Sequence, residues 1–284
     1  MRIRRGWIVA LLLPPLAFLL AFFIVPFVMV VLASLHDKAG GWSLANYTRA
    51  TGDLFYWRTL LLTFRISLWT TLVAFAIGYP LAYYITVVVK NRAIRRLFYI
   101  IIVTPLFTSS IVRSFGWMVL LGRRGLVNDA LVASGLVDHP LPIMFSEAAV
   151  VIGLSYIMTP FMVLTVSSVL QNIDRSLVEA AEDLGASRLV NFLTVTFPLS
   201  LPGVIAGSLI VFTLGVSAYV TPSIMSGGKQ VVMSMLIFQQ YGSVFDFNFG
   251  ATLAVALLVT TLVLVSFYLV AIERRPRAAR EAAA

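Results

Sequence analysis

Long apolar runs alternate with short polar segments along the whole chain. A helix needs about 20 mostly apolar residues to cross the hydrocarbon core of a bilayer. Runs of that length cover about residues 7–33, 61–89, 97–121, 146–170, 199–225 and 250–272. Because the segments between them are too short to fold alone, the pattern predicts an all-α integral membrane protein, with six transmembrane helices in a single domain over residues 1–284.

The composition supports this prediction and excludes other classes of protein. Sixty per cent of the residues are hydrophobic and 12% are charged, whereas soluble domains carry about 25% charged residues. The net charge of +9 comes from basic clusters at the ends of the apolar runs. That distribution is typical of membrane proteins and differs from a nucleic-acid-binding stripe. We therefore expect a bilayer, and no nucleic acid, as the partner of this surface.

The positions of lysine and arginine predict the orientation, because loops on the cytoplasmic side carry an excess of these residues. With the N-terminus inside, 13 of the 21 basic residues lie on the cytoplasmic side. They are Arg2, Arg4, Arg5, Lys90, Arg92, Arg95, Arg96, Arg175, Arg188, Arg274, Arg275, Arg277 and Arg280. Both termini are therefore expected in the cytoplasm.

Groups that could support catalysis or metal binding are scarce. The chain has no cysteine, and its two histidines, His36 and His139, lie far apart in loop-like segments. They are better interpreted as exposed loop residues than as a metal site. No Gly-x-x-x-x-Gly-Lys-Ser/Thr sequence is present to bind a nucleotide. We expect no enzyme, no metal site and no cofactor of the chain's own.

A polar, acidic segment at about residues 174–198 interrupts the apolar pattern on the expected cytoplasmic side. Asp174 can cap a helix, Gly185 can end that helix in the left-handed conformation, and Ser187 can cap a second short helix. Amphipathic helices that lie on lipid usually carry basic residues on their polar face. Because this one is acidic, we expect it to contact another protein.

The same segment resembles the EAA loop of bacterial ABC-importer permeases. The resemblance is carried by Glu179-Ala180-Ala181, by Gly185 and by the downstream Phe197-Pro198-Leu199-Ser200-Leu201-Pro202. It implies that the segment is a coupling helix, seated in a groove on a cytoplasmic ATPase subunit. The implied coupling residues are Glu179, Ala180, Ala181, Glu182, Asp183, Gly185, Pro198, Leu201 and Pro202.

Other segments are similar to the spermidine/putrescine-type subfamily of these permeases. They include Gly78-Tyr79-Pro80-Leu81-Ala82-Tyr83 and Tyr219-Val220-Thr221-Pro222. The resemblance implies a type I ABC-importer permease bundle in the bacterial inner membrane, which moves a polyamine, a related amine or an amino-acid derivative by alternating access. The implied partners are cytoplasmic ABC ATPase subunits, which bind the ATP, a second homologous permease, and a periplasmic or lipid-anchored solute-binding protein.

One departure from the subfamily concerns charge inside the membrane. Many of its members have Asp-Phe where this chain has Ala218-Tyr219. The predicted spans then contain no unambiguous carboxylate, and a buried organic cation needs compensating charge. Specificity is therefore expected to come mostly from the solute-binding protein or the second permease.

Candidates for the solute path are few. Arg113 lies about nine residues, or roughly 13 Å, inside the outer end of the third run, and a charge at that depth is a functional candidate. Ser110, Trp117 and Tyr219 complete the candidate path. Arg65 lies nearer the outer end of its run, where we expect its side chain to snorkel to the headgroups. The tryptophans and tyrosines of the runs are more typical of interface belts than of cation–π cages. Trp117, which lies near Arg113, is the exception to test first.

Prolines at positions 80, 105 and 160 fall inside the second, third and fourth runs. Each removes a backbone hydrogen bond and allows a kink. Pro80, Pro105 and Pro160 are therefore hinge candidates, although static membrane bundles contain such kinks too.

The alternative function is an ion-coupled secondary transporter. That class needs ionisable residues near the middle of the bilayer, and they are scarce in this sequence. An integral-membrane enzyme would need a cluster of His, Asp and Glu at one membrane face, which two isolated histidines do not supply.

Overall fold

Helices make up nearly all of the regular structure. The computed structural model describes residues 5–37 and 40–281, and within these ranges no strand is formed beyond an isolated bridge between His36 and Trp42. The all-α class predicted from the apolar runs is confirmed. The chain divides into two compact units, one made of Met1–Arg58 and Met235–Ala284 and the other of Thr59–Ser234.

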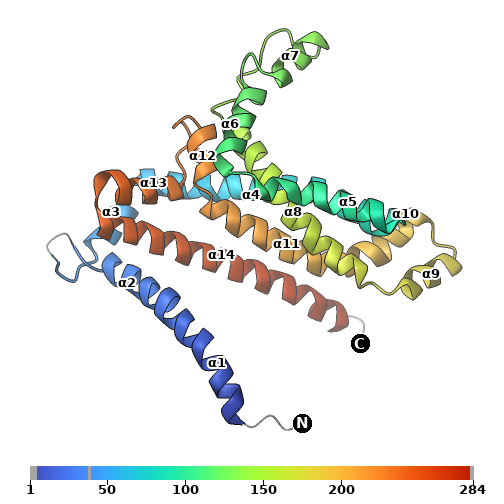
Figure 1. Ribbon diagram of the computed structural model, residues 1–284, viewed down its shortest axis with the longest axis horizontal. Coiled ribbons are helices and arrows are strands. Elements are labelled where there is room, and N and C mark those ends of the chain that lie inside the picture. Colours follow the sequence, from blue (N-terminus) through green and yellow to red (C-terminus); the bar gives the residue numbers. More distant parts are fainter. Residues whose placement is uncertain (1–4, 38–39, 282–284) are drawn as a thin grey trace. The chain divides into compact units, whose positions relative to one another are not determined.

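The first unit contains the two ends of the chain (Figure 1). Its elements are α1 (Arg5–Leu19), η1 (Leu20–Ile24), α2 (Val25–Ser34), α3 (Ala45–Gly52), the end of α13 (Met233–Gln239), η5 (Gln240–Val244) and α14 (Phe247–Glu281). Helices α2 and α14 pack together at one end, where the Thr252 hydroxyl donates to the Ser34 carbonyl at 3.1 Å. The Arg49 guanidinium lies 4.1 Å above the centre of the Phe249 ring, which holds α3 against α14.

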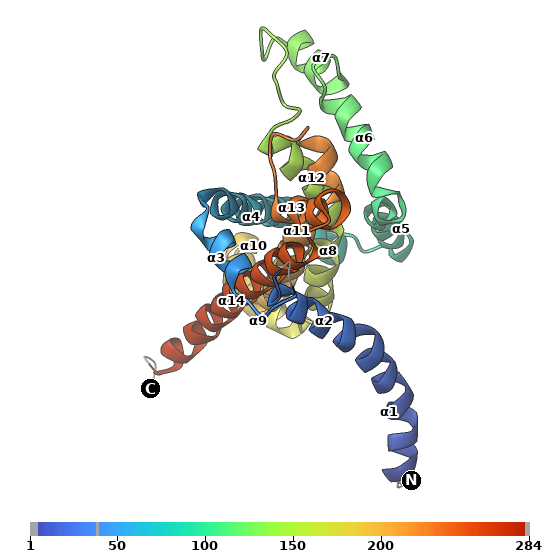
Figure 2. The ribbon, with the colours of Figure 1, turned by 90° about the vertical axis from the view of Figure 1, so that its left-hand side faces the viewer.

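The second unit contains the segments with the candidate functional residues. Its elements are α4 (Leu54–Tyr83, which begins in the first unit), η2 (Tyr84–Val88), α5 (Arg92–Val103), η3 (Thr104–Phe107), α6 (Ser110–Leu121), α7 (Leu126–Ala133), α8 (Glu147–Gln171), α9 (Arg175–Asp183), α10 (Arg188–Asn191), η4 (Phe192–Thr196), α11 (Phe197–Ser217) and α12 (Val220–Met225). Figures 1 and 2 both show α8 and α11 side by side.

Two glycines explain why α8 and α11 approach so closely. A Cβ atom added at Gly203 would lie 3.0 Å from the Thr165 carbonyl, and one at Gly207 would lie 2.5 Å from the Thr165 hydroxyl. Small residues four apart allow two membrane helices to pack backbone against backbone. The facing side chains Met162, Val163 and Val166 of α8 are fully buried. This helix pair is therefore the packed centre of the second unit.

Among the residues that the structure describes, five helices are long and apolar enough to cross a membrane, and a sixth span results if one bent pair is counted together. The helices cover Leu11–Ser34, Leu54–Val88, Glu147–Gln171, Arg188–Ser217 and Phe247–Ala271, and the bent pair is Arg92–Phe107 with Ser110–Ala133. The six predicted runs thus each correspond to a helical segment. The third and fifth runs differ from their helices in ways that have physical causes.

The third predicted span is broken. Its two halves are bent by 100° relative to one another, with the break after Phe107. Pro105 lies in the short 3₁₀ turn η3, and Thr108 and Ser109 are extended. Pro105 has no N–H to donate to the preceding turn, and the chain leaves the helical conformation at Thr108, so the apolar run does not continue as one helix.

The fifth helix begins and ends earlier than the apolar run of residues 199–225. It runs without interruption from Arg188 to Ser217, because the π turn η4 lets the Phe197 N–H bond to the Phe192 carbonyl and accommodates Pro198. At the other end Ala218 is extended and α12 begins at Val220. Pro222 would clash with the carbonyl four residues before it in a continuous helix, which explains the break.

Candidate functional site

The acidic segment forms two short helices with the predicted caps. The Ser176 N–H donates to the Asp174 carboxylate at 3.0 Å at the start of α9, and the Val190 N–H donates to the Ser187 hydroxyl at 3.4 Å at the start of α10. Both caps satisfy N–H groups that a helix start leaves unpaired. The predicted helix starts at Arg175 and Arg188 are confirmed.

Gly185 ends α9 in the left-handed conformation, with φ +84°. The Gly185 N–H donates to the Glu182 carbonyl at 2.9 Å, and the Ala186 N–H donates to the Ala181 carbonyl at 3.0 Å. This pair of bonds is a Schellman motif, which reverses the chain direction within two residues. The reversal and the Asn191 side-chain amide, which donates to the Val178 carbonyl at 3.1 Å, fix α9 against α10.

The Asp174 carboxylate that caps α9 is ionised near neutral pH. Hydrogen bonds from the backbone N–H and then the hydroxyl of Ser176 hold the pKa of Asp174 below its usual value. A lowered folded-state pKa stabilises the capped helix above the unfolded pKa, and this contribution is lost as the pH falls through the folded pKa. The carboxylate therefore stays ionised at the pH of a cell.

The charged side chains of the acidic segment face outward. Glu179, Glu182 and Asp183 are exposed, and the apolar Leu184 between the helices is 89% exposed. We call the surface formed by Glu179, Ala180, Glu182, Asp183 and Leu184 the acidic elbow. An acidic surface with a protruding leucine is suited to contact a protein that carries basic and apolar groups.

Aromatic rings connect the acidic elbow to the rest of the second unit. Phe192, the first residue of η4, packs edge-on against Tyr83 at 5.2 Å between ring centres, and Tyr79 packs against Phe197 at 5.5 Å. The Tyr79 hydroxyl also lies 2.9 Å from the Ser200 hydroxyl. These rings, Tyr79, Tyr83, Phe192 and Phe197, are called the aromatic cluster below. They join α4 to α11 next to the two π turns η2 and η4.

Arg113, the deepest predicted charge, binds atoms at the break of the third span. Its guanidinium donates to the Pro105 carbonyl and to the Ser110 hydroxyl at 3.0 Å. The Pro105 carbonyl also accepts from the Thr108 N–H at 3.3 Å, so the arginine adds a second donor to a backbone group at the break. The sequence did not indicate that Arg113 and Pro105 interact, since this depends on the bend between them.

The other candidate path residues lie around α6. Ser114 of α6 is within 3.4 Å of the Thr221 hydroxyl of α12, two residues after Tyr219, so the structure brings α6 near the start of α12. Trp117 packs edge-on against Tyr156 of α8 at 5.5 Å between ring centres. The Arg113 guanidinium binds backbone and serine oxygens, whereas the partner of Trp117 is the Tyr156 ring.

A mostly apolar cavity brings three of the predicted residues together. It has a volume of about 360 Å³ and is lined by Pro105, Trp117 and Pro160, with the hydroxyl-bearing Ser155 among aliphatic neighbours. The Ser155 hydroxyl is buried without a hydrogen-bond partner. Pro80, the remaining hinge candidate, is exposed on α4 next to the aromatic cluster and does not line this cavity.

Arg65 has a partner that the sequence did not reveal. Its guanidinium makes a two-pronged ion pair with Glu147, the first residue of α8, with 2.8 Å between Nε and Oε1. Snorkelling of Arg65 to the headgroups stays a prediction, to which the structure adds this ion pair. The two residues are 82 positions apart, and only the packing of α4 beside α8 brings them together.

Comparison with known proteins gives a consistent result. The family described as "Binding-protein-dependent transport system inner membrane component" matches residues 74–277. The chain is 35% identical over 215 residues to the spermidine/putrescine transport system permease protein PotB of Escherichia coli (strain K12), covering 76% of this chain and 77% of that protein. It is 30% identical over 261 residues to the protein of the same name from Haemophilus influenzae, covering 89% of each.

Solved structures share the fold. A chain of a bacterial ABC transporter involved in the import of the acidic polysaccharide alginate matches with a TM-score of 0.77 at 18% identity, covering 95% of this chain and 96% of that one. A chain of the MetNI methionine ABC transporter in an inward-facing conformation matches with a TM-score of 0.54 at 22% identity, covering 78% and 94%.

Proposed function

Since the chain belongs to the family of binding-protein-dependent transport system inner membrane components and is thus a multi-pass permease subunit of an ABC importer, we propose that its solute is a polyamine or a closely related amine. The relatives named spermidine/putrescine permeases, at 30–35% identity over most of the chain, carry this proposal. The solute would cross by alternating access. In this proposal both termini face the cytoplasm.

The acidic elbow is the proposed contact with the ATPase subunits. Three observations support this role: it is exposed, it carries three carboxylates, and its Gly185 turn holds α9 and α10 in a fixed relation. ATP would be bound by the partner subunits, and their closure would move the elbow. Pro198, Leu201 and Pro202 at the start of α11 would carry that movement into the membrane.

The cavity beside Trp117 is the proposed part of the solute path inside the bundle. It combines apolar walls, an aromatic ring and the unpaired Ser155 hydroxyl, which suits a solute with methylene groups and amines. Pro105 and Pro160 border it, and bending at these residues would change its width. Ser110, Arg113 and Tyr219 remain proposed path residues on the neighbouring α6 and α12.

Reconstitution tests the whole proposal. The chain, its second permease, its ATPase subunits and its solute-binding protein are placed in proteoliposomes, and uptake of radiolabelled spermidine and putrescine is measured with and without ATP. ATP-dependent uptake that needs the binding protein is the expected result. Accumulation by the chain alone, driven by an ion gradient, would instead establish an ion-coupled secondary transporter.

Glu179→Lys is expected to reduce ATP-dependent uptake about tenfold or more, because reversing one charge at a complementary interface replaces attraction with repulsion. The permease should still reach the membrane, since Glu179 is exposed and its side chain stabilises no buried contact. Uptake and the amount of permease in the membrane fraction are measured together. The matched control is Asp138→Lys, which also reverses an exposed negative charge but lies in a loop outside the acidic segment. Equal uptake in both variants would contradict the coupling role.

Phe192→Ala is expected to uncouple ATP hydrolysis from uptake. Loss of a half-buried aromatic ring costs about 2 kcal/mol, and here the lost contacts are those between η4 and Tyr79 and Tyr83. The ATPase rate of the reconstituted complex should persist while uptake per ATP falls several-fold. Leu193→Ala removes an exposed neighbour and should keep the wild-type ratio; a similar loss in that variant would argue against transmission through the aromatic cluster.

A further inference from the structure

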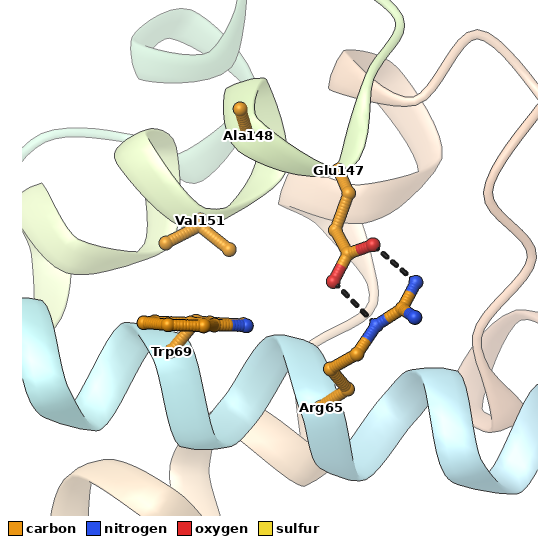
Figure 3. Close-up of a pocket in the computed structure, with 5 residues that line it drawn as sticks. All are labelled: Arg65, Trp69, Glu147, Ala148 and Val151. Carbon is orange, nitrogen blue, oxygen red and sulfur yellow. Dashed lines mark hydrogen bonds and ion pairs between the residues drawn. The ribbon is translucent and has the colours of Figure 1, made fainter.

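A second cavity lies between α4 and α8, at the end of α8 opposite the acidic elbow. It has a volume of about 440 Å³ and is lined by Arg65 and Trp69 of α4 and by Glu147, Ala148 and Val151 of α8. Residues four apart on a helix share one face, which places Arg65 beside Trp69 and Glu147 beside Val151. Figure 3 shows the four larger side chains turned toward one another around this space.

One carboxylate supplies the negative charge of this cavity. Glu147 accepts from the Arg65 Nε at 2.8 Å and from a second guanidinium nitrogen. The Arg65 side chain is 59% exposed and that of Glu147 is 25% exposed. Ion pairs open to water contribute little net stability, because solvent and salt screen them. A cation from solution can therefore replace the guanidinium at small cost.

The remaining walls suit a cation attached to a hydrocarbon chain. Trp69 lies with its ring face toward Val151, and the nitrogen end of its indole is turned toward the ion pair (Figure 3). The indole ring and the methyl groups of Ala148 and Val151 can cover methylenes. A carboxylate beside an indole ring and aliphatic walls matches an alkylammonium ion better than a bare metal cation or an anion.

We propose that this cavity binds an ammonium group of the amine solute, with Glu147 as the counter-ion, Trp69 and Val151 as the walls beside its methylenes, and Arg65 as a resident cation that the solute displaces. This proposal rests on the proposed amine transport and adds the residues that would recognise the amine. The competing role for the ion pair is to fasten α4 to α8.

The test uses the membrane complex of this chain with its second permease and ATPase subunits, in lipid nanodiscs and without the solute-binding protein. Binding of radiolabelled spermidine is titrated directly. Glu147→Gln should weaken binding about tenfold or more, because the ammonium loses its charged partner. Arg65→Gln should tighten binding about two- to fivefold, because the competing cation is gone. Glu147→Asp, which keeps the charge, should stay close to wild type.

The two roles predict opposite signs for Arg65. A mere fastening of α4 to α8 would make Arg65→Gln and Glu147→Gln equally harmful, and the thermal unfolding midpoint of the complex would fall in both. Any one of three results would overturn the amine site: that equal harm, unchanged binding in Glu147→Gln, or no spermidine binding by the wild-type complex. ATP-dependent spermidine uptake by the complete wild-type transporter is measured in parallel. Loss of that uptake would instead overturn the proposed polyamine transport.

Discussion

Gly185→Val is expected to reduce ATP-dependent uptake roughly tenfold or more while the protein remains in the membrane. Gly185 has φ +84° and closes the turn between α9 and α10. A branched side chain in the left-handed region costs about 1–3 kcal/mol, and the chain relieves that strain by giving up the turn. The acidic elbow then loses its shape. Uptake in proteoliposomes and the ATPase rate of the same complex measure the effect.

The matched control is Gly185→Asn, since asparagine tolerates the left-handed conformation better than other residues. A Cβ atom at this position would meet nothing within 4 Å, so neither variant is disturbed by crowding and the two differ only in backbone strain. Uptake near the wild-type rate is expected for Gly185→Asn. Equal activity of the valine and asparagine variants would show that the geometry of the turn does not matter for coupling.

Arg113→Ala is expected to lower uptake strongly, because it removes the donor to the Pro105 carbonyl and to Ser110 at the bend of the third span. A lost hydrogen bond from a charged group costs about 1.5–3 kcal/mol, and here the loss falls on a backbone carbonyl at a break inside the apolar region. The bend should become less fixed, and the cavity that Pro105 and Trp117 line should change with it. Uptake and thermal unfolding of the purified complex are measured together.

Arg113→Lys separates positive charge from geometry, since a lysine carries the charge but cannot donate to two acceptors in the fixed fork of a guanidinium. We expect it to recover only part of the uptake. Arg124→Ala removes an exposed arginine soon after α6 and serves as the control for loss of positive charge alone. If Arg113→Ala transports as well as Arg124→Ala, Arg113 has no part in the path or in the bend.

Much of the structure of the acidic segment could be predicted from the sequence, because its caps and its turn depend on residues close by in the chain. Asp174 caps the residue two positions later, Ser187 caps the residue three positions later, and Gly185 accepts its conformation for lack of a side chain. Such interactions form within one or two helical turns. The apolar runs are equally local, since length and composition alone decide whether a helix can cross the bilayer.

The limits of the third and fifth helices were harder to read, although their causes are also partly local. Hydropathy cannot distinguish a straight helix from one bent by 100° at Thr108 and Ser109, because both bury the same residues in lipid. The apolar run predicted a fifth span from residue 199, but the π turn η4 accommodates Pro198 and the helix begins at Arg188. A proline removes one backbone hydrogen bond at a known position, but the surrounding packing determines how the helix backbone adjusts to that loss.

The sequence by itself determined the class of this protein, its apolar spans and the caps of its acidic elbow, since these follow from solvent preference and from contacts within a few residues. Only the tertiary structure decided that Arg65 meets Glu147, 82 positions away, and that the Tyr79 hydroxyl meets Ser200, 121 positions away. The physical reason is that pairs across helices depend on which faces pack together. In a helix that is apolar on every face, periodicity does not show which face packs against a neighbouring helix.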